Sequence, residues 1–335
     1  MKKRKLLSII LAASLVLVFM TGCGRGQQDG VFIARAAVSN PPPHPFVLGI
    51  EILADLLYER SDGRIRVDVF HSGQLGSDRD IVEGIQFNTI QFGFITSAPL
   101  SGFTDAYMIF DLPFLFENIE EARAFTDSEF GLRILASLEN DGIIGLGFGE
   151  NGMRHITNSR RPIHTPADLS GIVIRTMENP MHMDAFRVMG ADPTPMAFGE
   201  LFTALQQGAI DAQENPFVVI HTSRFFEVQR YLSVTNHLYS PAPLLMSRIF
   251  YESLPTDLRQ IVREVGLEAS HLQRAVVDEQ SAIVLTELER EGMIINFVDP
   301  IPFMEATRAV YDTFVGSLVS HEAYNAVRNF LAGHR

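Results

Sequence analysis

The sequence has no tryptophan and only one cysteine among its 335 residues. A chain with one cysteine cannot form an internal disulfide, so a disulfide-rich scaffold is excluded. None of the ten histidines stands four residues from another, and none lies near the cysteine at the spacing of zinc ligands. We therefore expect neither a metal ion nor another cofactor.

The chain also lacks an excess of basic residues. It has 27 lysines and arginines against 40 aspartates and glutamates, which gives a formal net charge of −13. Nucleic-acid phosphates are bound by clustered lysine and arginine side chains, so nucleic-acid binding is not expected. The composition is that of a folded chain, and the length leaves room for two domains.

Sequence signatures of catalysis are missing as well. No G-x-S-x-G motif is present to expose a nucleophilic serine. Carboxylate pairs such as Glu120 and Glu121 fall on predicted helix faces, where solvated charge is the usual role. We therefore expect no catalytic residues and a protein that is not an enzyme.

One long hydrophobic run stands at the N-terminus. Residues 6–20 follow four basic residues at 2–5 and precede the small residues Thr21 and Gly22, which is the order of a signal peptide. The run is shorter than the roughly 20 residues of a membrane-spanning helix, so an uncleaved anchor is the lesser alternative. We predict a signal peptide over residues 1–22 and an exported protein.

The only cysteine directly follows this segment. The four residues that end at Cys23, Met-Thr-Gly-Cys, resemble the bacterial lipobox, although Met20 stands where leucine is usual. This predicts lipidation of Cys23, a flexible tether over 23–30 and an extracytoplasmic protein anchored to the membrane by lipid. Cleavage makes the chain still more acidic, so an anionic ligand would need a local arginine cluster.

Strands and helices alternate from residue 31 onward. Residues 31–38, 65–69 and 90–96 are typical of strands, with helices predicted over 46–57 and 77–88 between them. This order predicts a mainly parallel sheet with helices on both faces. A second set follows, which predicts two α/β lobes in series: strands at 143–148, 172–175 and 210–213, and helices at 119–138, 180–190 and 199–207.

A long helix is expected near the C-terminus. Between Pro255 and Glu291 there is no further proline and only one glycine, Gly266, while the apolar residues keep a helical period. Such a helix would be roughly 50 Å long and could brace both lobes. Two helices that break near Gly266 are the alternative.

Residues 147–152 match the dinucleotide-binding fingerprint G-x-G-x-x-G and follow a predicted strand. The fingerprint functions only where a helix begins at the third glycine. Residues 153–157 are instead typical of a strand. The glycines therefore favour a crossover between lobes with close backbone packing.

Three polar residues fall at the carboxyl ends of predicted strands, where ligands bind in open α/β folds. They are Arg154, Arg175 and Asn215. Arg175 also precedes a helix N-terminus at Pro180, and an arginine fork beside a helix dipole suits a carboxylate. A surface salt bridge is the alternative role of each arginine. The pattern predicts an exported two-lobe receptor for a small organic anion.

Several segments, in order, resemble the substrate-binding subunits (DctP family) of tripartite ATP-independent periplasmic (TRAP) transporters. The resemblance covers the chain from about residue 30 to about residue 302. The segments are Gln74-Leu75-Gly76, Asn151-Gly152-Met153-Arg154, Ile174-Arg175, Thr194-Pro195-Met196-Ala197-Phe198 with Glu200, Ala204-Leu205-Gln206 and Gln213-Glu214-Asn215-Pro216.

This resemblance implies an α/β, two-lobe fold like that of periplasmic binding proteins, with hinge strands and a long C-terminal helix that braces both lobes. We expect lobe I to comprise residues 31–151 plus 241–280. Lobe II would comprise residues 152–240 plus 281–335.

The resemblance also assigns ligand-binding roles. In that family the arginine of the Ile-Arg motif, here Arg175, pairs with the ligand carboxylate. Arg154 would add a second positive contact, Asn215 would hydrogen-bond the ligand, and Phe198 would line the pocket.

Four further residues are candidate ligand contacts. Asp78 and Thr96 come from the first lobe, and Thr96 stands where sialic-acid binders of the family carry glutamate, which counts against sialic acid. Glu178 and Asn179 lie in a stretch that looks more like the binders of sugar acids, such as uronates or keto-aldonates, than the C4-dicarboxylate binders. Helix capping by Asn179 before Pro180 is the alternative.

The expected function is ligand binding without chemistry. A small organic acid would be enclosed between the lobes, and the closed receptor would dock on the membrane permease subunits of a TRAP transporter. Three alternatives remain open: a C4-dicarboxylate receptor, a receptor that serves a sensor protein, and an extracytoplasmic enzyme.

Overall fold

The computed structural model describes residues 30–334. The predicted signal peptide, Cys23 and all but the last residue of the predicted tether lie outside these residues. No helix of the described chain has the length and hydrophobicity required to cross a membrane.

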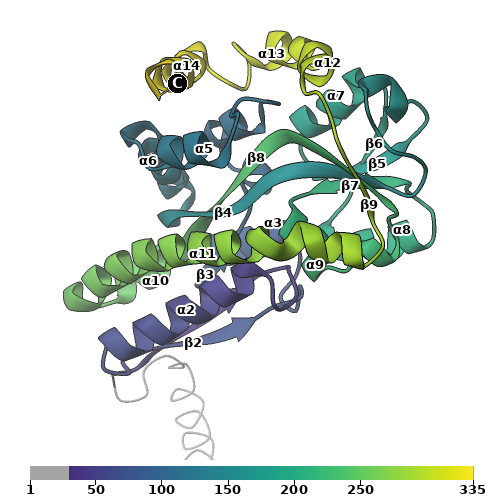
Figure 1. Cartoon of the computed structure of the whole chain (residues 1–335). Helices are drawn as coiled ribbons and strands as arrows, with labels where there is room; N and C mark the ends of the chain where they lie inside the picture. The colour runs from purple at the N-terminus through teal and green to yellow at the C-terminus, as the bar shows by residue number, and fades with distance from the viewer. Residues whose placement is uncertain (1–29, 335) are drawn as a thin grey trace, which may run out of the picture.

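The described residues form one mixed sheet of nine strands with helices on both faces (Figure 1). The strand order is β2-β1-β3-β8-β4-β7-β5-β6, and β9 pairs with β8. The strands are β1 (Phe32–Ala37), β2 (Ile65–Phe70), β3 (Phe92–Phe94), β4 (Ile143–Asn158), β5 (Val173–Thr176), β6 (Asp192–Pro195), β7 (Ala212–Asn215), β8 (Tyr231–Ser247) and β9 (Ile294–Phe297).

Two long strands, β4 and β8, cross the whole molecule and pair antiparallel. At one end β8 pairs with β3, and at the other end β4 pairs with β7. The predicted parallel pairing is found within β1–β3 and within β5–β7. The centre of the sheet is antiparallel, because the chain crosses to the second lobe in β4 and returns in β8.

The first lobe is built on β1–β3 and carries the helices of the first half of the chain. The predicted single helix over 119–138 is wrong, since the chain turns at 127–128 and Ser128 caps a new helix by accepting a hydrogen bond from Gly131 N. The helices of this lobe are α2 (Pro45–Arg60), α3 (Asp78–Gln86), α4 (Ser97–Leu100), η1 (Asp105–Asp111), α5 (Ile119–Thr126), α6 (Glu129–Ala136) and η2 (Ser137–Asp141).

The second lobe is built on β5–β7, and a C-terminal series of helices follows β8. The second-lobe helices are η3 (Pro166–Leu169), α7 (Pro180–Val188), α8 (Phe198–Gln206), α9 (Phe217–Thr222) and η4 (Phe225–Glu227). The C-terminal helices are α10 (Arg248–Ser253), α11 (Thr256–Arg290), α12 (Ile301–Ala306), α13 (Arg308–Phe314) and α14 (His321–His334).

The long C-terminal helix is confirmed as one continuous helix, α11, of 35 residues. It packs against α2 of the first lobe, β4 and α9 of the second lobe, so it spans both lobes (Figure 1). Gly266 lies within the helix, where an added Cβ would stand only 2.7 Å from Leu146 Cβ on β4. Gly266 therefore serves close packing, and the alternative of a break there is wrong.

The G-x-G-x-x-G segment lies inside β4, and no helix begins at its third glycine. A Cβ at Gly147 would meet Ser270 Oγ at 2.8 Å, and one at Gly149 would meet Gln273 Oε1 at 2.5 Å. These glycines let α11 pack closely on β4, and the predicted crossover between lobes is confirmed, since β4 runs from the first lobe to the second.

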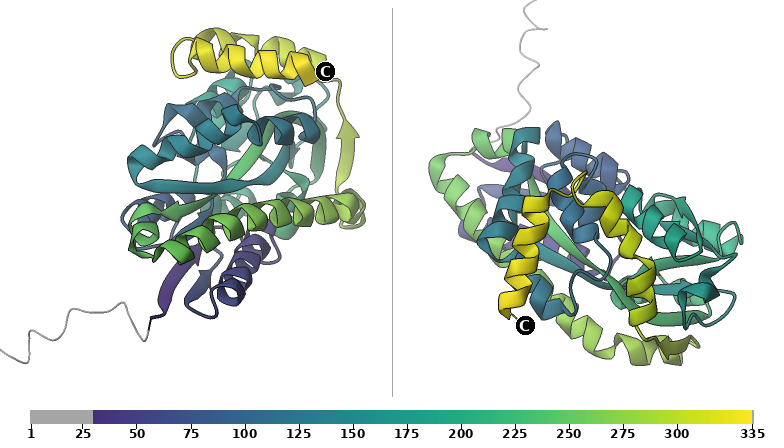
Figure 2. Two further views of the ribbon diagram at one scale, coloured as in Figure 1. Left: turned by 90° about the vertical axis from the view of Figure 1, so that its left-hand side faces the viewer. Right: turned by 90° about the horizontal axis from the view of Figure 1, so that it is seen from above.

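The last helices lie on the other side of the sheet from α11 (Figure 2). Here α13 packs against α7 of the second lobe. The ring of Phe330 on α14 lies 5.5 Å from that of Phe125 on α5 of the first lobe. The C-terminal segment thus touches both lobes, although the expected boundary assigns all of 281–335 to lobe II.

Candidate functional site

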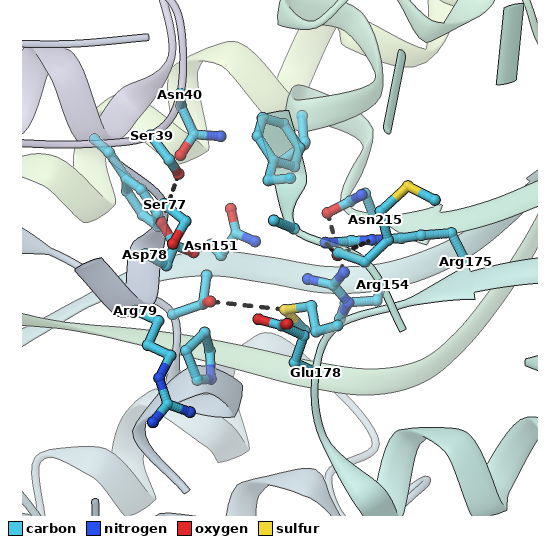
Figure 3. Close-up of a pocket in the computed structure, with 18 residues that line it drawn as sticks. Ser39, Asn40, Ser77, Asp78, Arg79, Asn151, Arg154, Arg175, Glu178 and Asn215 are labelled. Atoms are coloured by element: carbon cyan, nitrogen blue, oxygen red, sulfur yellow. Dashed lines mark hydrogen bonds between the residues drawn. The ribbon is translucent and has the colours of Figure 1, made fainter. Parts of the chain in front are cut away.

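A pocket lies between the two lobes, beside the crossing strand β4 (Figure 3). The cavity that remains between its side chains measures about 40 Å³. Seven of the eight ligand-binding residues predicted from the sequence line it: Asp78, Thr96, Arg154, Arg175, Glu178, Phe198 and Asn215.

Arg154 is fully buried on β4 and pairs with Glu214 on β7. Its Nε donates to Glu214 Oε2 at 2.5 Å, and its Nη2 donates to Glu214 Oε1 at 2.8 Å. Nη2 also donates to the main-chain oxygen of Glu214 at 2.7 Å. The remaining nitrogen, Nη1, is buried without a hydrogen-bond partner among the described residues. A buried donor without a partner costs free energy, so we expect Nη1 to donate to an acceptor on a ligand.

Glu214 is held ionised by its neighbours. Burial alone would raise the pKa of Glu214. The charge of Arg154 and the hydrogen bond with His237 lower it by more, so the pKa lies well below the ordinary value. His237 Nε2 lies 3.2 Å from Glu214 Oε2. Burial lowers the pKa of His237 in spite of that carboxylate. The fixed negative charge of Glu214 therefore balances Arg154.

Arg175 occupies the third position of β5 and is almost fully buried. Its Nε and Nη2 donate to the carbonyl oxygen of Met196 at 2.8 and 2.6 Å. Burial lowers the pKa of Arg175 to about 10, against the opposing effect of Glu214, so the guanidinium stays charged at neutral pH. Among residues 30–334 no carboxylate forms an ion pair with Arg175, so this cation suits an anionic ligand.

Asn215 ends β7 and belongs to a chain of buried amides. Its Oδ1 accepts a hydrogen bond from Arg154 Nη2 at 3.0 Å, and its Nδ2 donates to Gln213 Oε1 at 2.5 Å. Gln213 Nε2 in turn donates to Thr157 Oγ1 at 2.7 Å. These bonds fix the orientation of the Asn215 amide beside the arginine.

The first-lobe side of the pocket carries oxygen acceptors. Asp78 begins α3 and accepts a hydrogen bond from Ser39 Oγ at 2.5 Å. Burial raises the pKa of Asp78, and the Ser39 hydrogen bond opposes this shift. In Figure 3, Asp78 and Ser39 face Arg154 and Arg175 across the pocket, with Glu178 between them.

Two contacts define the rest of the wall. Thr96 Oγ1 lies 3.7 Å from the sulfur of Met177 across the lobe boundary. Phe198 begins α8, and its ring packs edge-to-face against Phe225 at 6.1 Å, which holds it at the pocket. Phe198 thus supplies an apolar surface beside the polar groups.

Asn179 does not line the pocket. Its Oδ1 accepts hydrogen bonds from the main-chain nitrogens of Met181 and His182, which caps α7 as in the alternative interpretation. Its Nδ2 donates to Asp111 Oδ2 at 2.8 Å.

Sequence reasoning missed several polar residues of the site: Ser39, Asn40, Ser77, Arg79 and Asn151 line the pocket, and Glu214 pairs with Arg154. Asn151 lines the pocket and its buried Oδ1 has no hydrogen-bond partner among the described residues. Glu214, the partner of Arg154, stands in the same motif as Asn215. The signal for Asn151 was its place beside Arg154 in one motif, while the pairing of Glu214 depends on the register of β4 and β7, which no local pattern reveals.

The site has the groups for binding an organic acid. One side offers two arginines, one with a free donor, and the other side offers carboxylate and hydroxyl groups (Figure 3). Within residues 30–334 no cluster of three or more histidine, cysteine, aspartate or glutamate side chains is arranged to hold a metal ion.

Comparison with known proteins gives a consistent result. The family model of the bacterial extracellular solute-binding proteins, family 7 (DctP), matches residues 36–317. The 2,3-diketo-L-gulonate-binding periplasmic protein YiaO of Escherichia coli K12 is 36% identical over 78% of this chain and 80% of its own length.

Two solved structures share the fold. A TRAP periplasmic solute-binding protein from Polaromonas sp. JS666, bound to D-erythronate, is 36% identical with a TM-score of 0.86, over 88% of this chain and 97% of its own. The sugar acid binding protein of Advenella mimigardefordensis, in complex with galactonate, is 29% identical with a TM-score of 0.88, over 91% of this chain and 99% of its own.

Proposed function

This chain belongs to family 7 of the bacterial extracellular solute-binding proteins, the DctP family of TRAP receptors, and on that premise we propose that it binds a sugar acid with one carboxylate. Members of this family are receptors that bind small acids outside the cytoplasm and work with membrane permease subunits. The bound acid would lie between the lobes, which pivot about β4 and β8.

One observation carries the choice of an acid. Nη1 of Arg154 is a buried donor that has no hydrogen-bond partner in the described part of the chain, and Arg154 lines the same pocket as Arg175. A ligand carboxylate would accept from both guanidinium groups and so remove the cost of the unpaired donor. Asn215 is positioned by Arg154 to bind the same end of the ligand.

The opposite side of the pocket supports a ligand with hydroxyl groups. Asp78 on this side, and Glu178 and the Oδ1 of Asn151 between the two sides, are acceptors to which hydroxyl groups can donate (Figure 3). A second carboxylate at this end would face the charges of Asp78 and Glu178. Arg79 also lines this side, but it is paired with Glu83 at 3.0 Å. The arrangement therefore favours a hydroxylated monocarboxylate over a C4-dicarboxylate.

The relatives support the same ligand class. Galactonate, D-erythronate and 2,3-diketo-L-gulonate are the ligands named for three similar proteins, and each carries one carboxylate and several hydroxyl groups. We infer that the ligand of this chain comes from the aldonates, keto-aldonates or uronates.

A thermal-shift screen tests the proposal. The dye-monitored melting temperature would be measured with aldonates, uronates, keto-sugar acids and C4-dicarboxylates. A ligand at 100 times its Kd stabilises the folded state by about 2.7 kcal/mol, a shift of a few degrees. A shift with succinate or malate alone would support the C4-dicarboxylate receptor instead, and no shift with any acid would refute an acid receptor.

The variant Arg175→Ala tests the assigned carboxylate contact. Calorimetry should show a loss of about 2–5 kcal/mol of binding free energy, because a buried ligand carboxylate loses its cation. Arg248→Ala on α10 is the matched control, since this arginine pairs with exposed Glu252 outside the pocket. Equal affinity of Arg175→Ala and the wild type would remove Arg175 from the site.

We also propose that lipidation of Cys23 anchors the receptor to the membrane surface. The Met-Thr-Gly-Cys motif and the preceding signal-peptide pattern support this. Mass spectrometry of the membrane-extracted protein should show an N-terminal lipid on Cys23, and Cys23→Ser should release the protein from the membrane fraction. An unmodified Cys23 in membrane-extracted protein would refute the anchor.

A further inference from the structure

Three buried polar side chains from the two lobes meet beside the pocket. Asp111 ends η1 of the first lobe and is 1% exposed, whereas Asn179 and His182 stand at the start of α7 in the second lobe and are 1% and 3% exposed. None of the three lines the pocket. Their contact therefore needs an explanation other than direct ligand binding.

Asp111 joins the other two side chains through both of its oxygens. Its Oδ2 accepts a hydrogen bond from Asn179 Nδ2 at 2.8 Å, and its Oδ1 lies 2.9 Å from His182 Nε2. Asn179 Nδ2 also reaches Ser101 Oγ of the first lobe at 3.2 Å. The N-terminus of α7 is thus tied to the first lobe at several points.

The hydrogen bonds of Asp111 are adjacent to the pocket. Asn179 directly follows Met177 and Glu178, which line the pocket. The contact between Thr96 and Met177 crosses the same boundary at 3.7 Å. These hydrogen bonds therefore join the two lobes at the wall of the pocket.

We propose that Asp111 is a positioning residue that forms an interlobe latch with Asn179 and His182, and that the latch slows release of the bound acid. This rests on the proposed function. A buried carboxylate is stable only when it is hydrogen-bonded, so the latch favours the arrangement in which both donors reach Asp111. Opening of the lobes would exchange these bonds for water, and this adds to the barrier for ligand release.

The substitution Asn179→Asp breaks the latch but keeps the helix cap. Its side chain still offers an oxygen to the main-chain nitrogens of Met181 and His182. It replaces the Nδ2 donor by an oxygen that faces Asp111, and two like charges then repel each other. We expect the release rate to rise roughly 10-fold to 100-fold, with the association rate changed far less.

The exchanged pair, Asp111→Asn combined with Asn179→Asp, provides the rescue. The donor then stands on η1 and the carboxylate on α7, so the hydrogen bond re-forms in the opposite sense. We expect its release rate to return to within about threefold of the wild type. Asp105→Asn on the same element is the matched control, because Asp105 is exposed at the opposite end of η1 from Asp111.

Release would be measured with radiolabelled galactonate after a chase with excess unlabelled acid. The latch would be overturned if Asn179→Asp released the acid at the wild-type rate, or if the exchanged pair released it as fast as the single variant does. Should the wild type bind none of the acids screened, the proposed function is refuted separately. The latch is then judged by small-angle X-ray scattering of the ligand-free proteins: a larger radius of gyration for Asn179→Asp, reversed in the exchanged pair, is expected, and equal radii would overturn it.

Discussion

The buried ion pair between Arg154 and Glu214 allows a quantitative prediction for the variant Glu214→Gln. Both side chains are 1% exposed, and two side-chain hydrogen bonds join them. Glutamine keeps one oxygen acceptor, but its NH₂ group would face an arginine donor, and the guanidinium would lose its counter-charge. Removing one partner of such a pair costs about 3–5 kcal/mol. We expect the free energy of unfolding to fall by that amount.

Urea unfolding at neutral pH measures this loss by linear extrapolation. The matched control is Glu252→Gln, which removes the partner of Arg248 in an exposed pair on α10. Exposed pairs of this kind contribute little to stability, because solvent screens their charges. A loss for Glu214→Gln no larger than that of the control would refute the assignment of Glu214 as the charge that holds Arg154.

The ligand should restore part of the lost stability. In Glu214→Gln the carboxylate of a bound sugar acid would be the counter-charge nearest to Arg154, so a saturating ligand should stabilise the variant more than the wild type. Because the pKa of Glu214 lies well below its ordinary value of 4.5, its contribution is present above about pH 4.5 and is lost as the pH falls below that value. The variant should lack this part of the acid destabilisation.

Two further predictions concern the fold. Burial lowers the pKa of His44 to about 3, and its neutral Nδ1 accepts the hydrogen bond that caps α2 from Phe46 N, so its contribution to stability is present above pH 6.5 and is lost as the pH falls toward 3. The variant His44→Asn keeps a cap acceptor, and it should flatten urea-measured stability over this range; an unchanged pH profile would contradict the assignment. Gly266→Ala should destabilise the protein by about 1–3 kcal/mol in the same assay, because the new Cβ meets Leu146, whereas Gly333→Ala has open space and should cost nothing. Equal stability of the two glycine variants would refute close packing as the role of Gly266.

The sequence predicted those parts of the fold that depend on local pattern. The periodic apolar residues located α11 and α2, and the Ser77 capping box located the start of α3. The split between α5 and α6 was missed, because an apolar period continues across the turn at 127–128 and the cap at Ser128 is a weaker signal.

The crossing strand β8 could not be predicted from local pattern. Pro241 and Pro243 interrupt it, and proline is unusual in a central strand. The structure accommodates them opposite Glu150 and Phe148 of β4, near a bulge in the pairing. Only the long-range partner makes this segment a strand, so the antiparallel centre of the sheet was also missed.

The candidate site was predicted more fully than the sheet that carries it. Arg175 and Asn215 stand near the ends of short strands whose position could be read locally, and the structure brings them together with Arg154 in one pocket. The latch residue Asp111 was missed, since it lies outside every motif and meets Asn179 from 68 positions away in the sequence.

The charges of the pocket explain how a protein with a net charge of −13 can bind an anion. Glu214 neutralises the charge of Arg154 but leaves the Nη1 of Arg154 available as a donor. The ion pair also holds the guanidinium in place before a ligand binds. Such preorganisation lowers the cost of ordering the site on binding. Arg175 is held only by a carbonyl oxygen and, among residues 30–334, has no carboxylate within ion-pair distance, so it supplies a positive charge for the ligand. One positive charge matches one carboxylate, and for this reason we expect discrimination against a second carboxylate to arise at the opposite, acceptor-lined side of the pocket.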